Sequence, residues 1–200
     1  MFIMNIIGIT GGIASGKSMV SSILQTLGTK IIDCDIVAKE IVMKGRPAYY
    51  ELIGHFGEDV LQEDGEIDRK KLAEIVFNNK DERLAINNIT HKYVYIELDK
   101  RIEEAKHDCT RILAIEASVP EHNRFISLTD EVWTVVSNKE DRIKRVIERD
   151  STTRAKALKR IESQMADQEY MKMADHVIIN TGNKDELKEI VIIRYNMIVK

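Results

Sequence analysis

The sequence predicts an α/β fold in which a parallel sheet lies between layers of helices. Short β-rich runs alternate with segments of helical periodicity, which favours a helix-covered parallel sheet over a bundle or a sandwich. A glycine-rich stretch separates the first β-rich run from the first helical segment. The chain has 200 residues, of which 44% are hydrophobic, and this suffices for one principal domain with a small appended subdomain.

The spacing of apolar residues places the first elements. We expect a strand over residues 3–9, a helix over residues 17–27 ended by Gly28, a strand over residues 30–32 and a helix from about Ile36. Between residues 45 and 106 the pattern changes to helices and turns. This stretch therefore predicts a mostly helical subdomain inserted into the sheet.

The remaining elements return to the alternation of strands and helices. Buried strands are expected over residues 111–115 and 132–136. Ser137 and Glu140 have the spacing of a capping box, which predicts that a helix begins there. A last strand over residues 176–179 and a closing helix from Lys184 complete the prediction.

Composition narrows the class of protein. Cys34 and Cys109 lie far apart and form no C-x-x-C pair, which argues against a zinc site or a disulfide framework and fits a cytoplasmic protein. The net charge of -3 argues against nucleic-acid binding. No apolar run approaches the roughly 20 residues of a membrane span. The apolar first residues lack a basic region before them, so we expect a buried strand there and no leader.

The most informative stretch follows the first predicted strand. Gly11-Gly12-Ile13-Ala14-Ser15-Gly16-Lys17-Ser18 satisfies the phosphate-loop motif G-x-x-x-x-G-K-[ST] and precedes a predicted helix. Backbone N–H groups and the helix N-terminus would hold phosphates there, with Lys17 on the β- and γ-phosphates and the Ser18 hydroxyl on Mg²⁺. A simple glycine turn before a capped helix is the alternative. The motif predicts a P-loop NTPase-like three-layer α/β/α core, which GTPases, ATPases and small-molecule kinases share.

Three carboxylates are expected at the carboxyl edge of the sheet, where ligands of such folds bind. Asp33 and Asp35 follow the second strand, and either could orient or deprotonate an acceptor hydroxyl. Asp35 is equally suited to cap the helix from Ile36. Glu116 follows the strand over residues 111–115 and could hold Mg²⁺ through water, or it could be a solvated glutamate at a strand end.

Arginines concentrate after Asp141, and they suggest a lid over the phosphates. The group comprises Arg142, Arg145, Arg149, Arg154 and Arg160. An ion-paired surface with neighbouring acids is the more common arrangement for any single arginine. His91 lies between apolar residues, which is typical of a structural histidine and not of a base.

In combination, these segments resemble the dephospho-coenzyme A kinases, which phosphorylate the ribose 3′-hydroxyl of dephospho-coenzyme A. The resemblance runs from about Ile6 to Asn180. It is carried by Ile9-Thr10 with the phosphate loop, Ile32-Asp33-Cys34-Asp35, Phe56-Gly57, Asp64-Gly65-Glu66-Ile67-Asp68-Arg69, Val76-Phe77, Ile89-Thr90-His91, Arg145 to Arg149-Asp150, Arg160-Ile161 with Gln164, and Ala174-Asp175-His176-Val177-Ile178-Ile179-Asn180.

The resemblance implies a role for each matching residue. ATP would be the co-substrate, with Mg²⁺ on Ser18 and Glu116, and the implied catalytic residues are Asp35, Lys17 and Arg145. The implied nucleotide-binding residues are Gly11, Gly12, Ala14, Ser15, Gly16, Lys17, Ser18, Met19, Arg145, Arg160 and Asn180. The implied acceptor-binding residues are Thr10, Asp33, Asp35, Arg69 and His91.

The resemblance also implies a division of the chain into three parts. The core would comprise about 1–44, 107–140 and 174–200, the helical acceptor subdomain about 45–106 and the lid about 141–173. The expected partners are ATP and dephospho-coenzyme A, in the cytoplasm, without nucleic acid or membrane. Oligomeric state is not encoded in any pattern of the sequence.

One segment departs from the family. Where the family has an aspartate and a Pro-Leu-Leu-Phe-Glu-like run, this chain has Glu116-Ala117-Ser118-Val119-Pro120-Glu121-His122-Asn123, and Met19 stands in place of a threonine. The change removes apolar contact that would meet the acceptor. A kinase for another hydroxyl acceptor, such as a nucleoside or nucleotide, and a binding protein without turnover therefore stand as alternatives to the leading prediction.

Overall fold

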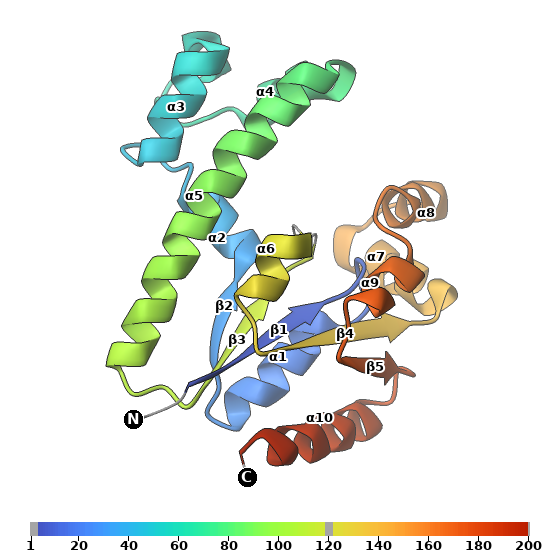
Figure 1. Cartoon of the computed structure of the whole chain (residues 1–200). Helices are drawn as coiled ribbons and strands as arrows, with labels where there is room; N and C mark the ends of the chain where they lie inside the picture. The colour runs from blue at the N-terminus through green and yellow to red at the C-terminus, as the bar shows by residue number, and fades with distance from the viewer. Residues whose placement is uncertain (1–3, 119–121, 200) are drawn as a thin grey trace. The chain divides into compact units, whose positions relative to one another are not determined.

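The computed structural model describes residues 4–118 and 122–199 (Figure 1). The chain forms two compact units. The core unit comprises Met1–Asp33 and Ala105–Lys200, and the insert unit comprises Cys34–Glu104. Each unit has its own hydrophobic core, so each is described by itself.

A five-stranded parallel sheet organises the core unit, with the strand order β2-β3-β1-β4-β5. The strands are β1 (Asn5–Thr10), β2 (Lys30–Asp33), β3 (Ile112–Glu116), β4 (Glu131–Ser137) and β5 (His176–Asn180). All five predicted strands are confirmed within one or two residues at their described ends. The register pairs Asp33 and Ile9 with Glu116, and Ser137 with Asn180, so the strand ends meet at one edge.

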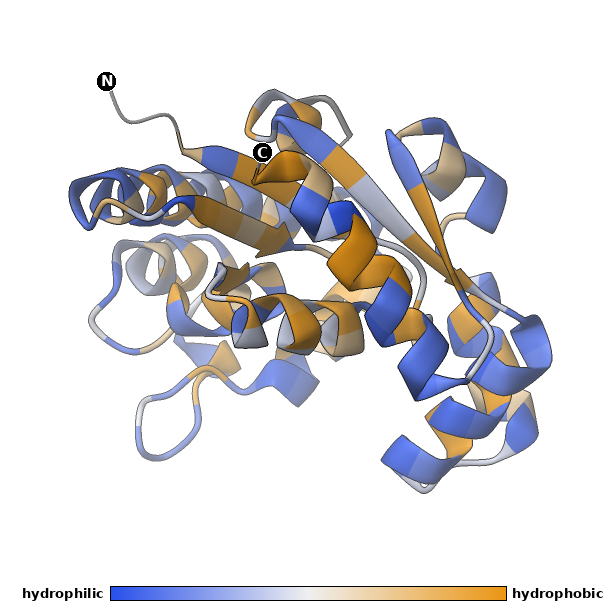
Figure 2. Cartoon of the chain, turned by 90° about the horizontal axis from the view of Figure 1, so that it is seen from below, coloured by the Kyte–Doolittle hydropathy of each residue, from blue (hydrophilic) through white to orange (hydrophobic). Residues whose placement is uncertain are grey.

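Helices cover both faces of this sheet and give the three layers predicted. On one face, α1 (Lys17–Thr26) and α10 (Lys184–Ile198) bury Val20, Leu24, Leu187 and Val191 in one cluster with Trp133. Figure 2 shows hydrophobic residues gathered along the strands and on parts of these helices. Because side chains alternate across a strand, the other face carries different contacts. There, α6 (His122–Ser127) and α9 (Asp167–Lys172) lie over the sheet.

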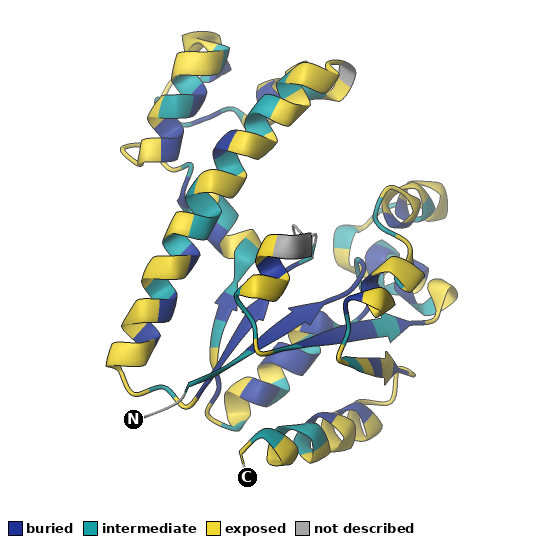
Figure 3. Ribbon diagram, in the orientation of Figure 1, coloured by how far each residue is buried: buried dark blue, intermediate teal, exposed yellow. Residues whose placement is uncertain are grey.

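The central strands are buried on both faces, as a parallel sheet between helices requires. Every residue of β3 is buried (Figure 3). On β1, Gly8 leaves room for Phe125 of α6, because a Cβ at Gly8 would lie 2.8 Å from that ring. On β4, the Thr134 hydroxyl donates to the Tyr170 carbonyl of α9 at 2.9 Å. These contacts fix the second helical layer to the sheet.

Two helices that lie between β4 and β5 in the chain pack on each other. They are α7 (Lys139–Asp150) and α8 (Arg154–Glu162), whose shared cluster contains Ile143, Val146, Ala157 and Ile161. Ile13 and Ala14 of the phosphate loop pack against the same cluster. The loop is therefore bound to these helices by apolar contact as well as by the polar contacts described below.

The predicted cap of α7 is wrong, and α2 begins two residues before the predicted start. Ser137 does not cap α7, because it is the last residue of β4 and its hydroxyl donates to the Asn180 carbonyl at 2.9 Å. The cap is Asn138, whose side chain accepts the Glu140 N–H at 2.8 Å. The helix α2 (Cys34–Glu40) begins directly after β2 and not at Ile36, so Asp35 lies in its first turn and is not its N-cap.

The insert unit is mostly helical. It contains α2, α3 (Pro47–Phe56), the 3-10 turn η1 (Glu58–Val60), α4 (Arg69–Asn78) and most of α5 (Lys80–His107). Its core cluster comprises Tyr49, Leu52, Val60, Ile67, Leu72 and Ile89. Asp68 caps α4 by accepting two backbone N–H groups. Among the described residues, no helix is long and apolar enough to cross a membrane.

Candidate active site

The phosphate loop connects β1 to α1 at the carboxyl edge of the sheet, as its motif predicts. Its turn relies on left-handed backbone at Ala14, with φ of 58°, and on positive φ of 112° at Gly16. A side chain at Gly16 would collide with Asn180, because a Cβ there would lie 2.1 Å from the Asn180 Nδ2. Glycine is therefore required at this position by both backbone angle and contact.

Three consecutive carbonyl groups of the loop accept hydrogen bonds from side chains of other elements. Arg142 Nε donates to the Ile13 carbonyl at 2.9 Å, and Arg145 Nη1 donates to the Ala14 carbonyl at 3.0 Å. Asn180 Nδ2 donates to the Ser15 carbonyl at 2.8 Å. In a trans peptide the C=O and N–H point in opposite directions. The Ala14 and Gly16 N–H groups, which follow the first and third of these carbonyls, are thus turned to the other side of the loop, as an anion site requires. The Ser15 N–H instead donates to the Gly12 carbonyl at 3.1 Å within the loop.

Two further groups of the loop are suited to phosphate. Lys17 is only 6% exposed, and its ammonium donates to the Gly11 and Gly12 carbonyls at 2.9 and 3.3 Å. The Ser15 hydroxyl is buried and has no hydrogen-bond partner within residues 4–118 and 122–199. Buried hydroxyls normally have a partner, so an anion in the loop would complete this site.

Glu116 is buried at the end of β3 and binds two serines of α1. The Ser18 hydroxyl donates to one carboxylate oxygen of Glu116 at 3.0 Å, and the Ser21 hydroxyl donates to the other at 2.6 Å. Glu116 is 7% exposed, so the alternative of a solvated glutamate is wrong. Ser21 was not predicted, although it lies three residues after Ser18 on the same helix face. The grouped oxygens are the ligand type that Mg²⁺ prefers.

Two predicted residues contribute to packing in this structure. Thr10 is fully buried, and its hydroxyl donates to the Ala117 carbonyl at 3.0 Å. Thr10 thus exposes no surface to which an acceptor would bind in this structure. Met19 packs against the core cluster under the sheet, and its N–H donates to the Gly16 carbonyl at 3.0 Å. The contact of Met19 with the loop is thus made by its backbone N–H.

The arginine cluster divides into two groups. Arg142 and Arg145 bind the loop as described, and Arg142 is only 3% exposed. The other three arginines form surface ion pairs, Arg149 and Arg160 with Asp150 and Arg154 with Glu140. The alternative of an ion-paired surface is therefore confirmed for Arg149, Arg154 and Arg160. The hydrogen bond from Arg149, with the nearby arginine charges, lowers the pKa of Asp150.

The predicted acceptor residues lie in both units. Asp33 ends β2 in the core unit, opposite Glu116 in the register. Asp35, Arg69 and His91 belong to the insert unit, where Arg69 donates to the Lys39 carbonyl at 3.4 Å and His91 is exposed on α5. In the departing segment, residues 119–121 lie outside the described residues.

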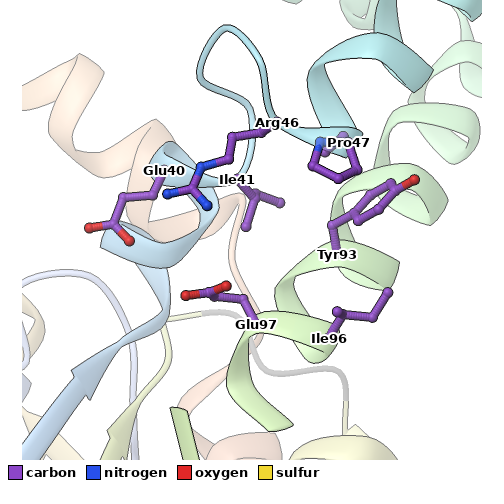
Figure 4. Close-up of a pocket in the computed structure, with 8 residues that line it drawn as sticks. Glu40, Ile41, Arg46, Pro47, Tyr93, Ile96 and Glu97 are labelled. Atoms are coloured by element: carbon purple, nitrogen blue, oxygen red, sulfur yellow. The ribbon is translucent and has the colours of Figure 1, made fainter. Parts of the chain in front are cut away.

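A pocket of about 180 Å³ lies within the insert unit (Figure 4). Apolar groups form much of its wall, with polar groups at Glu40, Arg46 and Glu97, and the full lining is Glu40, Ile41, Arg46, Pro47, Ala48, Tyr93, Ile96 and Glu97. Arg101 forms ion pairs with Glu40 and Glu97. The sequence did not predict this pocket, because its lining comes from α2, α3 and α5 together.

Comparison with known proteins gives a consistent result. A family model described as Dephospho-CoA kinase matches residues 5–186. The chain is 43% identical over 189 residues to a dephospho-CoA kinase of Carboxydothermus hydrogenoformans, covering 94% of this chain and 92% of that protein. The solved dephospho-CoA kinase from Campylobacter jejuni has a TM-score of 0.73 and 27% identity, covering 98% of each chain.

A more distant structure supports the fold alone. The shikimate kinase from Acinetobacter baumannii is 12% identical with a TM-score of 0.57, covering 99% of this chain and 94% of that chain. Its likeness extends over nearly the whole length of both chains, which agrees with a parallel sheet covered by helices.

Proposed function

The chain belongs to the dephospho-CoA kinase family, and from this membership and the site we propose that it transfers the γ-phosphoryl group of ATP to the ribose 3′-hydroxyl of dephospho-CoA. The products are CoA and ADP. The observation that carries the proposal is the phosphate loop, with its carbonyls held outward and Lys17 held within it. The reaction consumes ATP, and we place it in the cytoplasm.

The core unit supplies the nucleotide side of the reaction. The loop residues 11–19 hold the phosphates of ATP through backbone N–H groups and the α1 N-terminus. Lys17 and Arg145 offset the charge that develops on the transferring group. On this proposal Arg160 of α8 exchanges its ion pair with Asp150 for the phosphates, and Asn180 holds the loop beside the base of the nucleotide.

Ser18 and Glu116 are the residues that would hold Mg²⁺. The Ser18 hydroxyl oxygen and a carboxylate oxygen of Glu116 lie 3.0 Å apart, and Glu116 is buried. A hard cation would bind both oxygens in place of the hydrogen bond between them. When bound, Mg²⁺ neutralises phosphate charge during transfer. Ser21 holds the second oxygen of Glu116 and thereby fixes the orientation of this carboxylate.

The acceptor side depends on the insert unit and on the end of β2. Asp35 accepts or orients the proton of the attacking hydroxyl, and Asp33 lies two residues before it. Arg69 and His91 contribute to the acceptor site from α4 and α5. The pocket on the insert unit has the mixture of apolar wall and few polar groups that suits a pantetheine-like arm. On this proposal residues 45–106 form the acceptor subdomain and residues 141–173 the lid.

The decisive assay measures ADP release from Mg-ATP by the full chain, with and without dephospho-CoA, and confirms the added phosphate on the product by mass. We expect release to depend on the acceptor. Nucleosides and nucleotides in place of dephospho-CoA test the second acceptor class. Tight ATP binding without product from any acceptor would instead indicate a binding protein without turnover.

Two substitutions separate the nucleotide and acceptor roles. Lys17→Ala is expected to abolish transfer and weaken ATP binding, because it removes the charge that faces the phosphates. Asp35→Asn is expected to abolish transfer while ATP binding, measured by calorimetry, stays unchanged. Asp141→Asn, a change of the same kind on α7, serves as the control. Full activity in Asp35→Asn would remove its acceptor role.

A further inference from the structure

Gln164 binds the backbone of the phosphate loop, a contact that no motif of the loop requires. Its side-chain oxygen accepts the Ile13 N–H at 2.6 Å. Ile13 N–H and the Gly12 carbonyl belong to one peptide group. That carbonyl accepts the Ser15 N–H at 3.1 Å and the Lys17 ammonium at 3.3 Å. The Gly12–Ile13 peptide is therefore held at both ends, with Gln164 at one end and Lys17 at the other.

The next peptide of the loop, Ile13–Ala14, is held by Arg142. Arg142 Nε donates to the Ile13 carbonyl at 2.9 Å, and Arg142 Nη1 binds Asp167 at 2.7 Å. The Arg142 side chain is only 4% exposed and lies against Gly12, where a Cβ would be 2.1 Å from its Nη2. Buried arginines are costly unless they are paired and hydrogen-bonded. Asp167 and the loop carbonyl satisfy this requirement together.

The position of Gln164 depends on α8. Gln164 follows that helix, and its N–H donates to the Ile161 carbonyl at 3.3 Å. Ile161 lies in the apolar cluster against which Ile13 packs. A displacement of α8 would thus remove the apolar contact to Ile13 and the hydrogen bond to its N–H at the same time.

We propose that Gln164 is a positioning residue that fixes the Gly12–Ile13 peptide, while the Arg142–Asp167 ion pair fixes the next one, and that Gln164 so couples α8 to nucleotide binding. If this peptide rotated, the Gly12 carbonyl would leave the Lys17 ammonium and change the surroundings of the group that meets the phosphates. Gln164 acts on ATP only through the loop backbone. The proposal rests on the nucleotide role of the loop, but its geometry can be tested without turnover.

The test compares Gln164→Leu with Gln168→Leu, the same change at an exposed glutamine of α9. In the ¹⁵N-labelled full chain, amide hydrogen exchange of Ile13 is expected to become about five- to tenfold faster in Gln164→Leu, because one hydrogen bond is lost. Amides of β1 and β3 serve as internal references and should keep their rates. Calorimetry should show ATP affinity reduced about five- to tenfold. Gln168→Leu should match the unchanged chain in both measurements.

A second variant keeps the proposal testable if Gln164→Leu does not fold. Gln164→Asn keeps the amide but shortens it by one methylene, and it should move both measurements in the same direction. In the transfer assay, KM for ATP should rise while KM for dephospho-CoA stays constant. Unchanged exchange at Ile13, equal acceleration across β1 and β3, or unchanged ATP affinity would each overturn the proposal. Loss of transfer in Gln164→Leu with normal exchange and ATP affinity would also overturn this coupling, whereas absence of transfer by the unchanged chain would count against the proposed function alone.

Discussion

Single residues of the phosphate loop differ in what their backbone angles permit. Ala14 adopts φ of 58°, within the left-handed region that residues with a Cβ can enter. Gly16 adopts φ of 112°, which such residues rarely reach. An alanine is thus acceptable at position 14, whereas position 16 admits only glycine.

Gly16→Ala tests this difference against Gly28→Ala. Both glycines have positive φ, but a Cβ at Gly28 would meet nothing within 4 Å. We expect Gly28→Ala to cost about 1–2 kcal/mol of unfolding free energy through backbone strain and to leave ATP binding unchanged. Gly16→Ala should add displacement of Asn180 and lower ATP affinity at least tenfold. Denaturant unfolding and calorimetry measure the two effects, and equal ATP affinity in both variants would contradict the expectation.

At the scale of elements, the helix pair α7 and α8 has two polar systems with different tasks. Arg142 and Arg145 on α7 bind the phosphate loop. Near the turn between the helices, Asp150 binds both Arg149 and Arg160. The arginines of this second system are exposed, so it pairs their charges without burying them.

The Asp150 system predicts a dependence of stability on pH. Arg149 lowers the pKa of Asp150 in the folded chain below its ordinary value, which is about 3.9 in unfolded chains. The stabilisation is therefore complete above about pH 4 and is lost as pH falls through the lowered pKa. The difference in Tm between the unchanged chain and Asp150→Asn should be present at pH 7 and shrink below about pH 4. A difference that does not change with pH would indicate packing in place of charge.

The elements themselves were largely predictable, and the failures have a local cause. Strands followed from β-rich runs, because burial on both faces leaves few polar residues in them. Ser137 does not cap α7 because it is still part of β4, where it pairs with Asn180 of β5. α2 began early because the chain passes from β2 into a helix without a turn. Neither the end of β4 nor the start of α2 changes the local spacing of apolar and polar residues.

At the scale of the whole molecule, the loop motif predicted where phosphates bind but not what holds the loop. Lys17 and Ser18 followed from the motif, and Glu116 followed from its place after a buried strand. Gln164 and Asp167 did not, since their contacts depend on how α8 and α9 pack on distant residues. Ser21 of α1 was missed for the same reason, because its partner Glu116 lies on β3, far along the chain.

Nucleotide binding is expected to stabilise the chain as a whole. A ligand that binds only the folded state at one hundred times its Kd adds about 2.7 kcal/mol. For a chain of this length, that corresponds to a rise in Tm of roughly 5–10 °C with saturating Mg-ATP. Lys17→Ala should lose most of this rise in differential scanning fluorimetry. An equal rise in both would place the nucleotide outside the loop.

The three outward carbonyls have a consequence for the order in which the site is made during protein synthesis. Their donors lie 129, 131 and 165 positions further along the chain than the loop residues they bind. The motif emerges from the ribosome ahead of all three donors, and the last of them arrives only with Asn180. A nascent chain thus carries the complete motif long before the side chains that hold the loop in its phosphate-binding conformation. We therefore expect the ability to bind ATP to arise late in translation.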